Sequence, residues 1–296
     1  MQHGTSAPRE WRAACTDTLA GPGLSASRVR FGSSARSLIM TVVSSTEIPF
    51  RSKVGAQLVL GFALIAIWEA TATWLVDPFW IGKPSAIAQR LWDVFVHGDM
   101  LTHTGITLFH SVVGLLLSLL VGVPIGILFA AKRSIADTVE PYFLGFYSLP
   151  RVALAPLFIL WFGIGSISKI MMAFSMVVFI VILNTHEGLR GVDRDLVDML
   201  KTMRASRLYM LRKVLLPSIV PWIFASLRVG IGLALVGAVI GELLGANRGL
   251  GWYVEYAAGR VDIIGVFAGL VVLAVLGMAL NEIVKAVESR VTAGRY

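Results

Sequence analysis

The chain has 296 residues, of which 56% are hydrophobic and 15% are charged, and its formal net charge is +8 at pH 7. Soluble domains carry about 25% charged residues, so this composition is typical of an integral membrane protein. The basic residues lie at the ends of apolar runs and not on one polar domain, which argues against nucleic-acid binding. The single cysteine, Cys15, excludes an intramolecular disulfide, and five scattered His residues lack metal-ligand spacing. We predict neither a metal site nor a cofactor.

Residues 1–49 precede the first apolar run and form a predicted cytoplasmic tail. The stretch Met1–Ser37 is rich in Ser, Ala, Gly and Arg and has no sustained apolar period, which is typical of disorder. It also lacks the continuous apolar centre of a signal peptide. Two interpretations remain: an organellar targeting sequence, or a reading frame extended upstream of a true start at Met40.

Six later stretches are suited to membrane helices, because a hydrocarbon core of about 30 Å needs roughly 20 apolar residues. The predicted spans cover residues 54–76, 106–131, 142–163, 168–187, 217–241 and 263–284. They define an all-α membrane domain over residues 50–290, with a cytoplasmic C-terminal tail at 291–296. Most of the 26 Lys and Arg residues then fall on the side that carries both termini. Because basic loops stay in the cytoplasm, both termini are predicted to be cytoplasmic.

A short amphipathic helix is predicted between the first two spans. The segment Ser85–Val96 follows Pro84 and places Ile87, Leu91, Val94 and Phe95 on one helical face. This helix either covers the bundle on its outer surface or contacts a solute, and helical spacing does not distinguish the two.

A cationic insert of about 30 residues, Gly188–Pro217, separates the fourth and fifth spans and must lie in water. Asp193 can cap a first helix and Ser206 a second one, with the pattern broken between them. The apolar positions of the two helices are Leu196, Leu200 and Met203, then Leu208, Leu211 and Leu215. The insert is either a solvated loop that fixes topology or a helical hairpin that docks on a partner.

The insert resembles the Glu-Ala-Ala coupling loop of permease subunits of ATP-binding-cassette (ABC) importers. Asp198-Met199-Leu200 stands in the Glu-Ala-Ala place, Ala205-Ser206-Arg207 matches an Ala-Ser-Arg-like step, and Val214-Leu215-Leu216-Pro217 matches the terminal Ile-x-Leu-Pro. This chain has Arg204 where the family has a loop glycine, and it keeps only the acidic member of the first triplet.

The resemblance covers about residues 50–290 and is closest to the nitrate/sulfonate/taurine permease group. Three further stretches carry it: Lys83-Pro84-Ser85, Leu149-Pro150-Arg151 through Trp161-Phe162-Gly163-Ile164-Gly165, and Gly241-Glu242-Leu243-Leu244-Gly245-Ala246 followed by Gly249-Leu250-Gly251. Several motifs in the right order make the resemblance specific.

The resemblance implies a type I ABC importer permease fold with a cytoplasmic coupling helix between the fourth and fifth spans, in a bacterial cytoplasmic membrane. It implies two cytoplasmic ATPase subunits, an external solute-binding protein and a second permease copy as partners. It also implies a small anionic solute such as a sulfonate, taurine or nitrate. The residues expected to contact the ATPase are Asp198, Lys201, Met203, Arg204, Ala205, Ser206, Arg207 and Leu208. Met203 and Leu208 are assigned to packing, and Ala205 to the closest approach.

Charged residues within membrane helices are costly and often functional. Glu69, Arg228 and Glu242 are therefore candidates for the translocation pathway. Arg228 either meets an anionic solute or pairs with an acid on a neighbouring helix, and Glu242 fits an ordinary helix boundary.

The sequence contains no Gly-x-x-x-x-Gly-Lys-Ser/Thr phosphate loop, so any ATP hydrolysis is expected on another polypeptide. The alternatives are an ion-coupled secondary transporter and an intramembrane enzyme. The first lacks an evident relay of ionisable groups or an internal repeat. The second lacks paired Asp residues, a His-Glu-x-x-His site or a Ser/His constellation.

Overall fold

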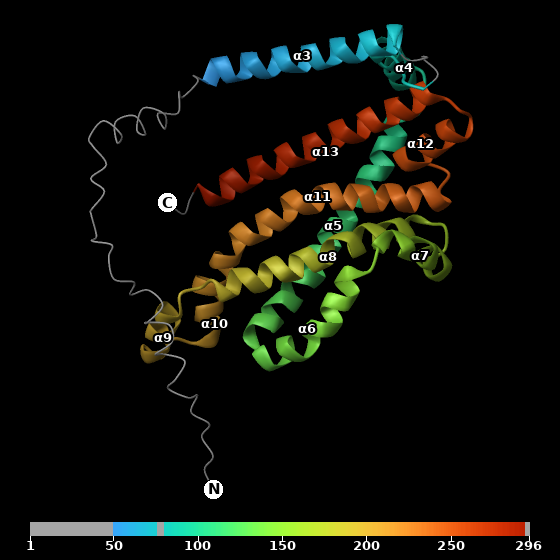
Figure 1. The fold of residues 1–296 in the computed structure, drawn as a ribbon. Helices are drawn as coiled ribbons and strands as arrows, with labels where there is room; N and C mark the ends of the chain where they lie inside the picture. Colours follow the sequence, from blue (N-terminus) through green and yellow to red (C-terminus); the bar gives the residue numbers. More distant parts are fainter. Residues whose placement is uncertain (1–49, 76–79, 294–296) are drawn as a thin grey trace, which may run out of the picture. The chain divides into compact units, whose positions relative to one another are not determined.

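The computed structural model describes residues 50–75 and 80–293, and these residues contain helices and no strand. The chain divides into two compact units, residues 1–61 and 62–296. Of the first unit only the start of α3 (Phe50–Trp74) is described, and the second unit holds the remaining elements (Figure 1). The predicted tail at 1–49 and residues 294–296 lie outside the described part.

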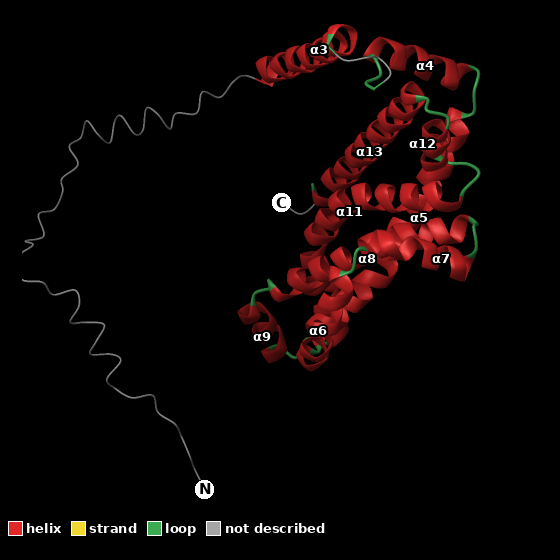
Figure 2. Cartoon of the chain, turned by 45° about the vertical axis from the view of Figure 1, so that its right-hand side comes forward, coloured by secondary structure: helices red, strands yellow, loops and turns green. Residues whose placement is uncertain are grey.

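Short loops join the helices of the second unit (Figure 2). In chain order they are α4 (Pro84–Val96), α5 (Met100–Ala131), α6 (Arg133–Ser148), a 3-10 turn (Arg151–Leu154), α7 (Ala155–Phe162), α8 (Ser166–Arg190), α9 (Arg194–Thr202), α10 (Arg207–Met210), a π-helical turn (Leu211–Leu215), α11 (Leu216–Gly245), α12 (Leu250–Gly259) and α13 (Ile263–Thr292).

Five helical segments in the described residues are long and apolar enough to cross a membrane, and they correspond to all the predicted spans except the third. The predicted third span, 142–163, is bent by 85° between α6 and the segment Arg151–Phe162, and it counts as a span only as a broken pair. Pro150 explains the bend. It restricts Leu149 to an extended conformation, with φ −64° and ψ 134°, and therefore ends α6.

The core of the second unit is built on α8, which packs between α5 and α11. Small residues allow both contacts. On α5, a Cβ added at Gly114, Gly122 or Gly126 would lie 2.6–2.8 Å from side-chain atoms of Ala173, Val181 and Thr185. In these contact pairs the residue numbers increase together along α5 and α8, so the two helices run parallel.

The α8–α11 contact runs in the opposite sense. A Cβ at Gly241 would lie 3.0 Å from the Cα of Lys169, and one at Gly237 would lie 2.7 Å from the Cα of Ala173. The close packing expected of such glycines in membrane helices is therefore present at these positions. Gly232 differs, because an added Cβ would meet nothing within 4 Å.

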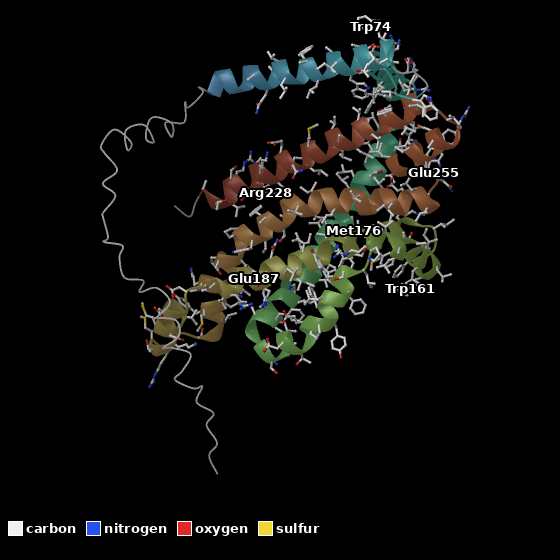
Figure 3. The ribbon with its side chains drawn as sticks, in the orientation of Figure 1. Trp74, Trp161, Met176, Glu187, Arg228 and Glu255 are labelled. Carbon is white, nitrogen blue, oxygen red and sulfur yellow. The ribbon has the colours of Figure 1, made fainter. Side chains whose placement is uncertain are left out.

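The predicted amphipathic helix forms as α4 and covers the bundle. Ile87 is buried, and Leu91 and Val94 pack against the cluster around Met100, Leu250 and Val272. Phe95 remains 38% exposed. Figure 3 shows the two ends of the second unit: Glu187 lies toward α9, and Trp161 and Glu255 lie at the opposite end.

Candidate functional site

The cationic insert folds as a hairpin, here residues 193–215, whose two helices are both capped as predicted. The Asp193 carboxylate accepts a hydrogen bond from the backbone N–H of Asp195 at 2.9 Å. The Ser206 hydroxyl accepts one from the backbone N–H of Tyr209 at 3.2 Å. Side-chain acceptors of this kind satisfy N–H groups that a helix start leaves unpaired, and typically stabilise it by about 1 kcal/mol. The hairpin is therefore an ordered element.

The corner of the hairpin is closed by a left-handed residue. Arg204 has φ 54°, in the region that glycine adopts most readily. Its backbone N–H donates to the carbonyl of Lys201 at 2.9 Å, and the N–H of Ala205 donates to that of Leu200 at 3.0 Å. This pair of bonds is a Schellman motif, which satisfies the last carbonyls of α9. Arg204, which stands where the resembled family has a loop glycine, thus adopts a backbone conformation that glycine favours.

Apolar side chains surround this corner and are not covered by the chain itself. Met203 is 68% exposed and Leu208 is 55% exposed, so both residues assigned to partner packing are available for it. Met199 and Tyr209 are also exposed, and neither was among the residues predicted to contact the partner. Their positions one turn before Met203 and next to Leu208 could have indicated them. Such clustered apolar exposure at a water-facing corner is typical of a docking surface.

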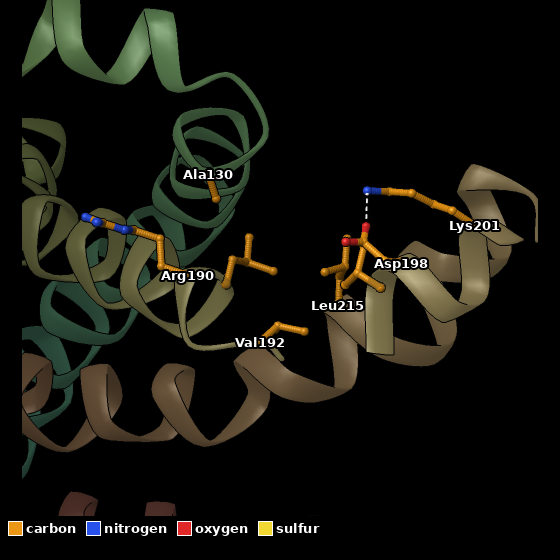
Figure 4. A pocket seen from close by; sticks show the side chains of 8 residues that line it. Ala130, Arg190, Val192, Asp198, Lys201 and Leu215 are labelled. Carbon is orange, nitrogen blue, oxygen red and sulfur yellow. Dashed lines mark hydrogen bonds and ion pairs between the residues drawn. The ribbon is translucent and has the colours of Figure 1, made fainter. Parts of the chain in front are cut away.

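The remaining predicted contact residues lie around the same corner. Lys201 donates to Asp198 at 2.7 Å across one turn of α9, and both side chains are largely exposed (Figure 4). Arg204 and Ser206 are exposed, and Ala205 is half-buried. The side chain of Arg207 is outside the described part of the structure.

A cavity of about 420 Å³ separates α9 from the bundle. Ala130 of α5 and Arg190 of α8 line one side, and Asp198 and Lys201 line the other (Figure 4). The first helix of the hairpin, α9, therefore stands away from the ends of α5 and α8.

The second helix of the hairpin continues directly into a candidate membrane span. Residues Leu208–Gly245 form one candidate span, so the predicted boundary near Pro217 does not interrupt the helix. The π-helical turn explains this, because the N–H of Leu216 donates five residues back, to the carbonyl of Leu211. The wider turn accommodates the proline, whose ring would otherwise clash with the carbonyl four residues earlier.

Glu69, the first of the three candidate pathway residues, joins α3 to α4. Its carboxylate accepts bonds from the backbone N–H of Ser85 at 3.0 Å and from the Ser85 hydroxyl at 2.8 Å. Ser85 lies in the first turn of α4, where a negative charge is favourable.

Arg228 pairs with Glu288 of α13, so the structure contains the interhelical pairing that was one of its two predicted roles. The guanidinium Nε lies 3.0 Å from the Glu288 carboxylate, and half of the arginine side chain remains exposed.

Glu242 is fully buried, which an ordinary helix boundary does not require. Its carboxylate lies 2.8 Å from His110 Nδ1 and accepts bonds from the Thr107 hydroxyl at 2.8 Å and the Gly251 N–H at 2.9 Å. The N–H of Leu250 in turn donates to the Thr107 hydroxyl at 2.7 Å. Glu242 thus ties α11 to α5 and to the start of α12.

A second buried charge, Lys169, was not selected from the sequence. It is 2% exposed, and its ammonium group donates to the carbonyls of Ile164 and Gly245. Gly245 ends α11, where a positive charge is favourable. The sequence placed Lys169 at the edge of a span and gave no indication that another helix end covers it.

Together, the fold and the hairpin define a multi-pass membrane protein with an exposed helical hairpin between two of its most buried candidate spans. Residues 122–293 match the family described as the binding-protein-dependent transport system inner membrane component. The chain belongs to this family and is a permease subunit of an ABC importer.

Several relatives agree with this membership. A "Probable ABC transporter permease protein" of Haemophilus influenzae is 35% identical over 73% of this chain and 88% of its own. The formylaminopyrimidine transport permease protein ThiX of Halalkalibacterium halodurans is 31% identical over 76% and 90%. The taurine transport system permease protein TauC of Escherichia coli is 26% identical over 86% and 96%.

A solved structure shares the fold. A chain from inward-facing conformations of the MetNI methionine ABC transporter matches with a TM-score of 0.53 and 21% identity, over 64% of this chain and 95% of that one. The type I importer permease fold predicted from the sequence is therefore confirmed. Family membership sets aside the secondary transporter and the intramembrane enzyme.

Proposed function

We propose that this chain forms the translocation pathway of an importer for a small organic anion, with taurine-like sulfonates as the solute class. A cytoplasmic ATPase drives the pathway through the hairpin, and a solute-binding protein delivers the solute outside. A second copy of the chain completes the pathway in a bacterial cytoplasmic membrane.

The continuity of the hairpin with the bundle carries the coupling proposal. The hairpin follows α8 within three residues and passes without a break into α11. These two helices pack closely through Gly237 and Gly241, so a displacement of the corner moves both. An ATPase that binds Met203 and Leu208 can therefore change the packing of α8 against α11.

The partners follow from the family and from the sequence. The family description specifies a binding protein, and the chain has no phosphate loop of its own. Hydrolysis is thus assigned to separate subunits, with Ala205 at the closest approach and Lys201, Arg204 and Arg207 at the edge of the contact.

The orientation rests on the basic residues. The hairpin carries Lys201, Arg204 and Lys213 among others, and such segments resist translocation. Both termini and the hairpin are therefore placed in the cytoplasm, and α4 and α12 outside.

The solute proposal rests on the resemblance and on the taurine permease among the relatives. The formylaminopyrimidine permease shows that one fold serves a different solute, so the class needs its own test. Nitrate is the less supported member of the class, because none of the relatives described above is named for it.

Reconstitution in proteoliposomes tests the proposal. The permease is combined with candidate ABC ATPase and solute-binding proteins from the same organism, and uptake of labelled taurine is measured with and without ATP. We expect uptake that requires ATP and the binding protein, with competition by ethanesulfonate. ATP-dependent uptake of a non-anionic solute alone would overturn the solute class, and uptake driven by an ion gradient without ATP would overturn the mechanism.

A further inference from the structure

A second cavity, of about 460 Å³, lies at the end of the bundle opposite the hairpin. It is formed by α5, the start of α8 and the loop between α11 and α12. The residues that matter for its chemistry are Gly105, Ile106, Phe109, His110, Lys169 and Arg248.

Two cationic side chains line this cavity. The buried ammonium group of Lys169 uses two of its three N–H groups on the carbonyls of Ile164 and Gly245, which leaves one for another acceptor. Arg248 lies on the loop after α11 and is exposed at the rim. The nearby carboxylate of Glu242 already accepts bonds from Thr107 and Gly251 and faces His110.

His110 supplies an unused hydrogen-bonding atom at the wall of the cavity. The residue is 3% exposed, and its Nδ1 lies 2.8 Å from the Glu242 carboxylate. Its Nε2 is buried and has no partner in the described part of the chain, and it donates to an oxyanion when the ring carries a proton on both nitrogens. A buried polar atom without a partner typically costs about 1–3 kcal/mol, so such atoms call for a ligand or a role.

The N-terminus of α8 opens into the same cavity. Gly165 and Ser166 line it, and no side chain caps this 25-residue helix. The Ser168 hydroxyl donates to the carbonyl of Gly165 and so leaves the first-turn N–H groups uncapped. Free N–H groups and the helix dipole favour an anion at this position.

We propose that this cavity binds a small oxyanion, a sulfonate, carboxylate or phosphate group, between Lys169, His110, Arg248 and the start of α8. The side chains of Ile106 and Phe109 contact the hydrocarbon part of the ligand. The oxyanion comes either from a free solute or from the headgroup of an anionic lipid, since both present the same chemistry. The site belongs to one permease subunit and does not depend on the proposed transport cycle.

The test measures binding to the purified full-length permease without ATPase. Permease in phosphatidylcholine nanodiscs is titrated with ethanesulfonate by saturation-transfer NMR. A second arm adds phosphatidylglycerol to the nanodiscs and detects retained lipid by native mass spectrometry.

Two pairs of variants identify the site. Gly105→Phe fills the cavity and Gly232→Phe is its matched control, because an added Cβ at either glycine meets nothing within 4 Å. Arg248→Gln removes the rim charge, and Arg260→Gln is the control at an arginine outside the cavity. We expect Gly105→Phe to weaken oxyanion binding at least 10-fold and Arg248→Gln several-fold, with both controls unchanged.

The results of the two binding measurements show whether the bound oxyanion comes from a free solute or from a lipid headgroup. Ethanesulfonate binding that Gly105→Phe removes supports a free solute, and phosphatidylglycerol retention that the same variant removes supports a headgroup. If neither ligand binds the wild-type protein, or if Gly105→Phe and Gly232→Phe bind equally, the proposal is wrong. Because no transport is measured, a failure here leaves the importer proposal untouched, and failed uptake leaves this site untouched.

Discussion

The backbone N–H of Ala205 donates to the carbonyl of Leu200 at 3.0 Å, and this bond closes α9 around a left-handed Arg204. The end of α12 repeats the arrangement. There the N–H of Asp262 donates to the carbonyl of Ala257 at 2.9 Å around Val261, whose φ is 58°. Both helices thus end in the same motif without the glycine that usually allows it.

Arg204→Gly is expected to stabilise the permease by about 1 kcal/mol. A left-handed conformation strains a residue with a Cβ and does not strain glycine, although glycine's freer unfolded chain offsets part of the gain. The measurement is the midpoint of thermal unfolding of the purified protein in detergent. An unchanged or lower midpoint would show that the Arg204 side chain contributes more than its backbone strain costs.

Val261→Gly is expected to raise the same midpoint by at least as much. Valine is β-branched and is rarer than arginine in this backbone region. The Val261 side chain is 56% exposed, so little packing is lost. A decrease would mean that the side chain packs on a surface outside this chain.

Glu242→Leu is expected to destabilise the bundle by about 3–5 kcal/mol, since it removes the carboxylate that contacts His110, Thr107 and Gly251. The expected result is a lower unfolding midpoint with loss of ordered protein at the growth temperature. Glu255→Gln, at an exposed glutamate on α12, is the control and should change stability by no more than about 0.5 kcal/mol. If the two variants have the same unfolding midpoint, the contacts of Glu242 do not stabilise the bundle.

Substitutions at Arg228 and Glu288 distinguish a role of this ion pair in the translocation pathway from a purely structural role. If Arg228 sets the field along the route of an anion, Arg228→Gln raises KM for the solute, and Glu288→Gln lowers KM because it leaves the guanidinium uncompensated. If the pair only holds α11 to α13, both variants reduce uptake in the same way. We expect the opposite shifts, measured as initial uptake rates in proteoliposomes.

Two matched cysteines test the orientation. In a Cys15→Ser background, Asp195→Cys lies on the hairpin and Glu255→Cys on α12, and both positions are exposed. An impermeant maleimide should label only Glu255→Cys in intact cells and both variants after permeabilisation. Labelling of Asp195→Cys in intact cells would reverse the proposed topology.

Local signals were enough to predict most of the fold. Apolar length located α3, α5, α8, α11 and α13, and the side chains of Asp193 and Ser206 marked both helix starts of the hairpin. The predicted third span corresponds to a pair of helices bent by 85°, and apolar length did not indicate the bend that Pro150 introduces. Pro217 lies in the first turn of α11, and the sequence did not indicate the π-helical turn that joins this helix to the hairpin.

Long-range partners could not be predicted. Neither the burial of Glu242 nor that of Lys169 follows from its neighbours in sequence, because their partners come from other helices or helix ends. The pairing of Arg228 with Glu288 likewise joins two spans, and the sequence could offer it only as an alternative.

The central claim is that the corner of the hairpin couples the ATPase to the pathway, and Ala205→Trp tests it most directly. A large side chain at the closest approach should block the contact while leaving the permease folded. Lys201→Ala removes one member of an exposed pair, which contributes only about 0–1 kcal/mol, so it should weaken coupling only in part. Asp195→Trp places the same bulk on the exposed start of α9 and serves as the control.

The measurement is co-purification of the ATPase with each variant, together with ATP-driven uptake, after thermal unfolding has shown that the variants are folded. The account predicts that Ala205→Trp loses both the ATPase and uptake, that Lys201→Ala retains part of each, and that Asp195→Trp retains both. Normal uptake by Ala205→Trp would contradict the account and leave the hairpin as a loop that only fixes topology.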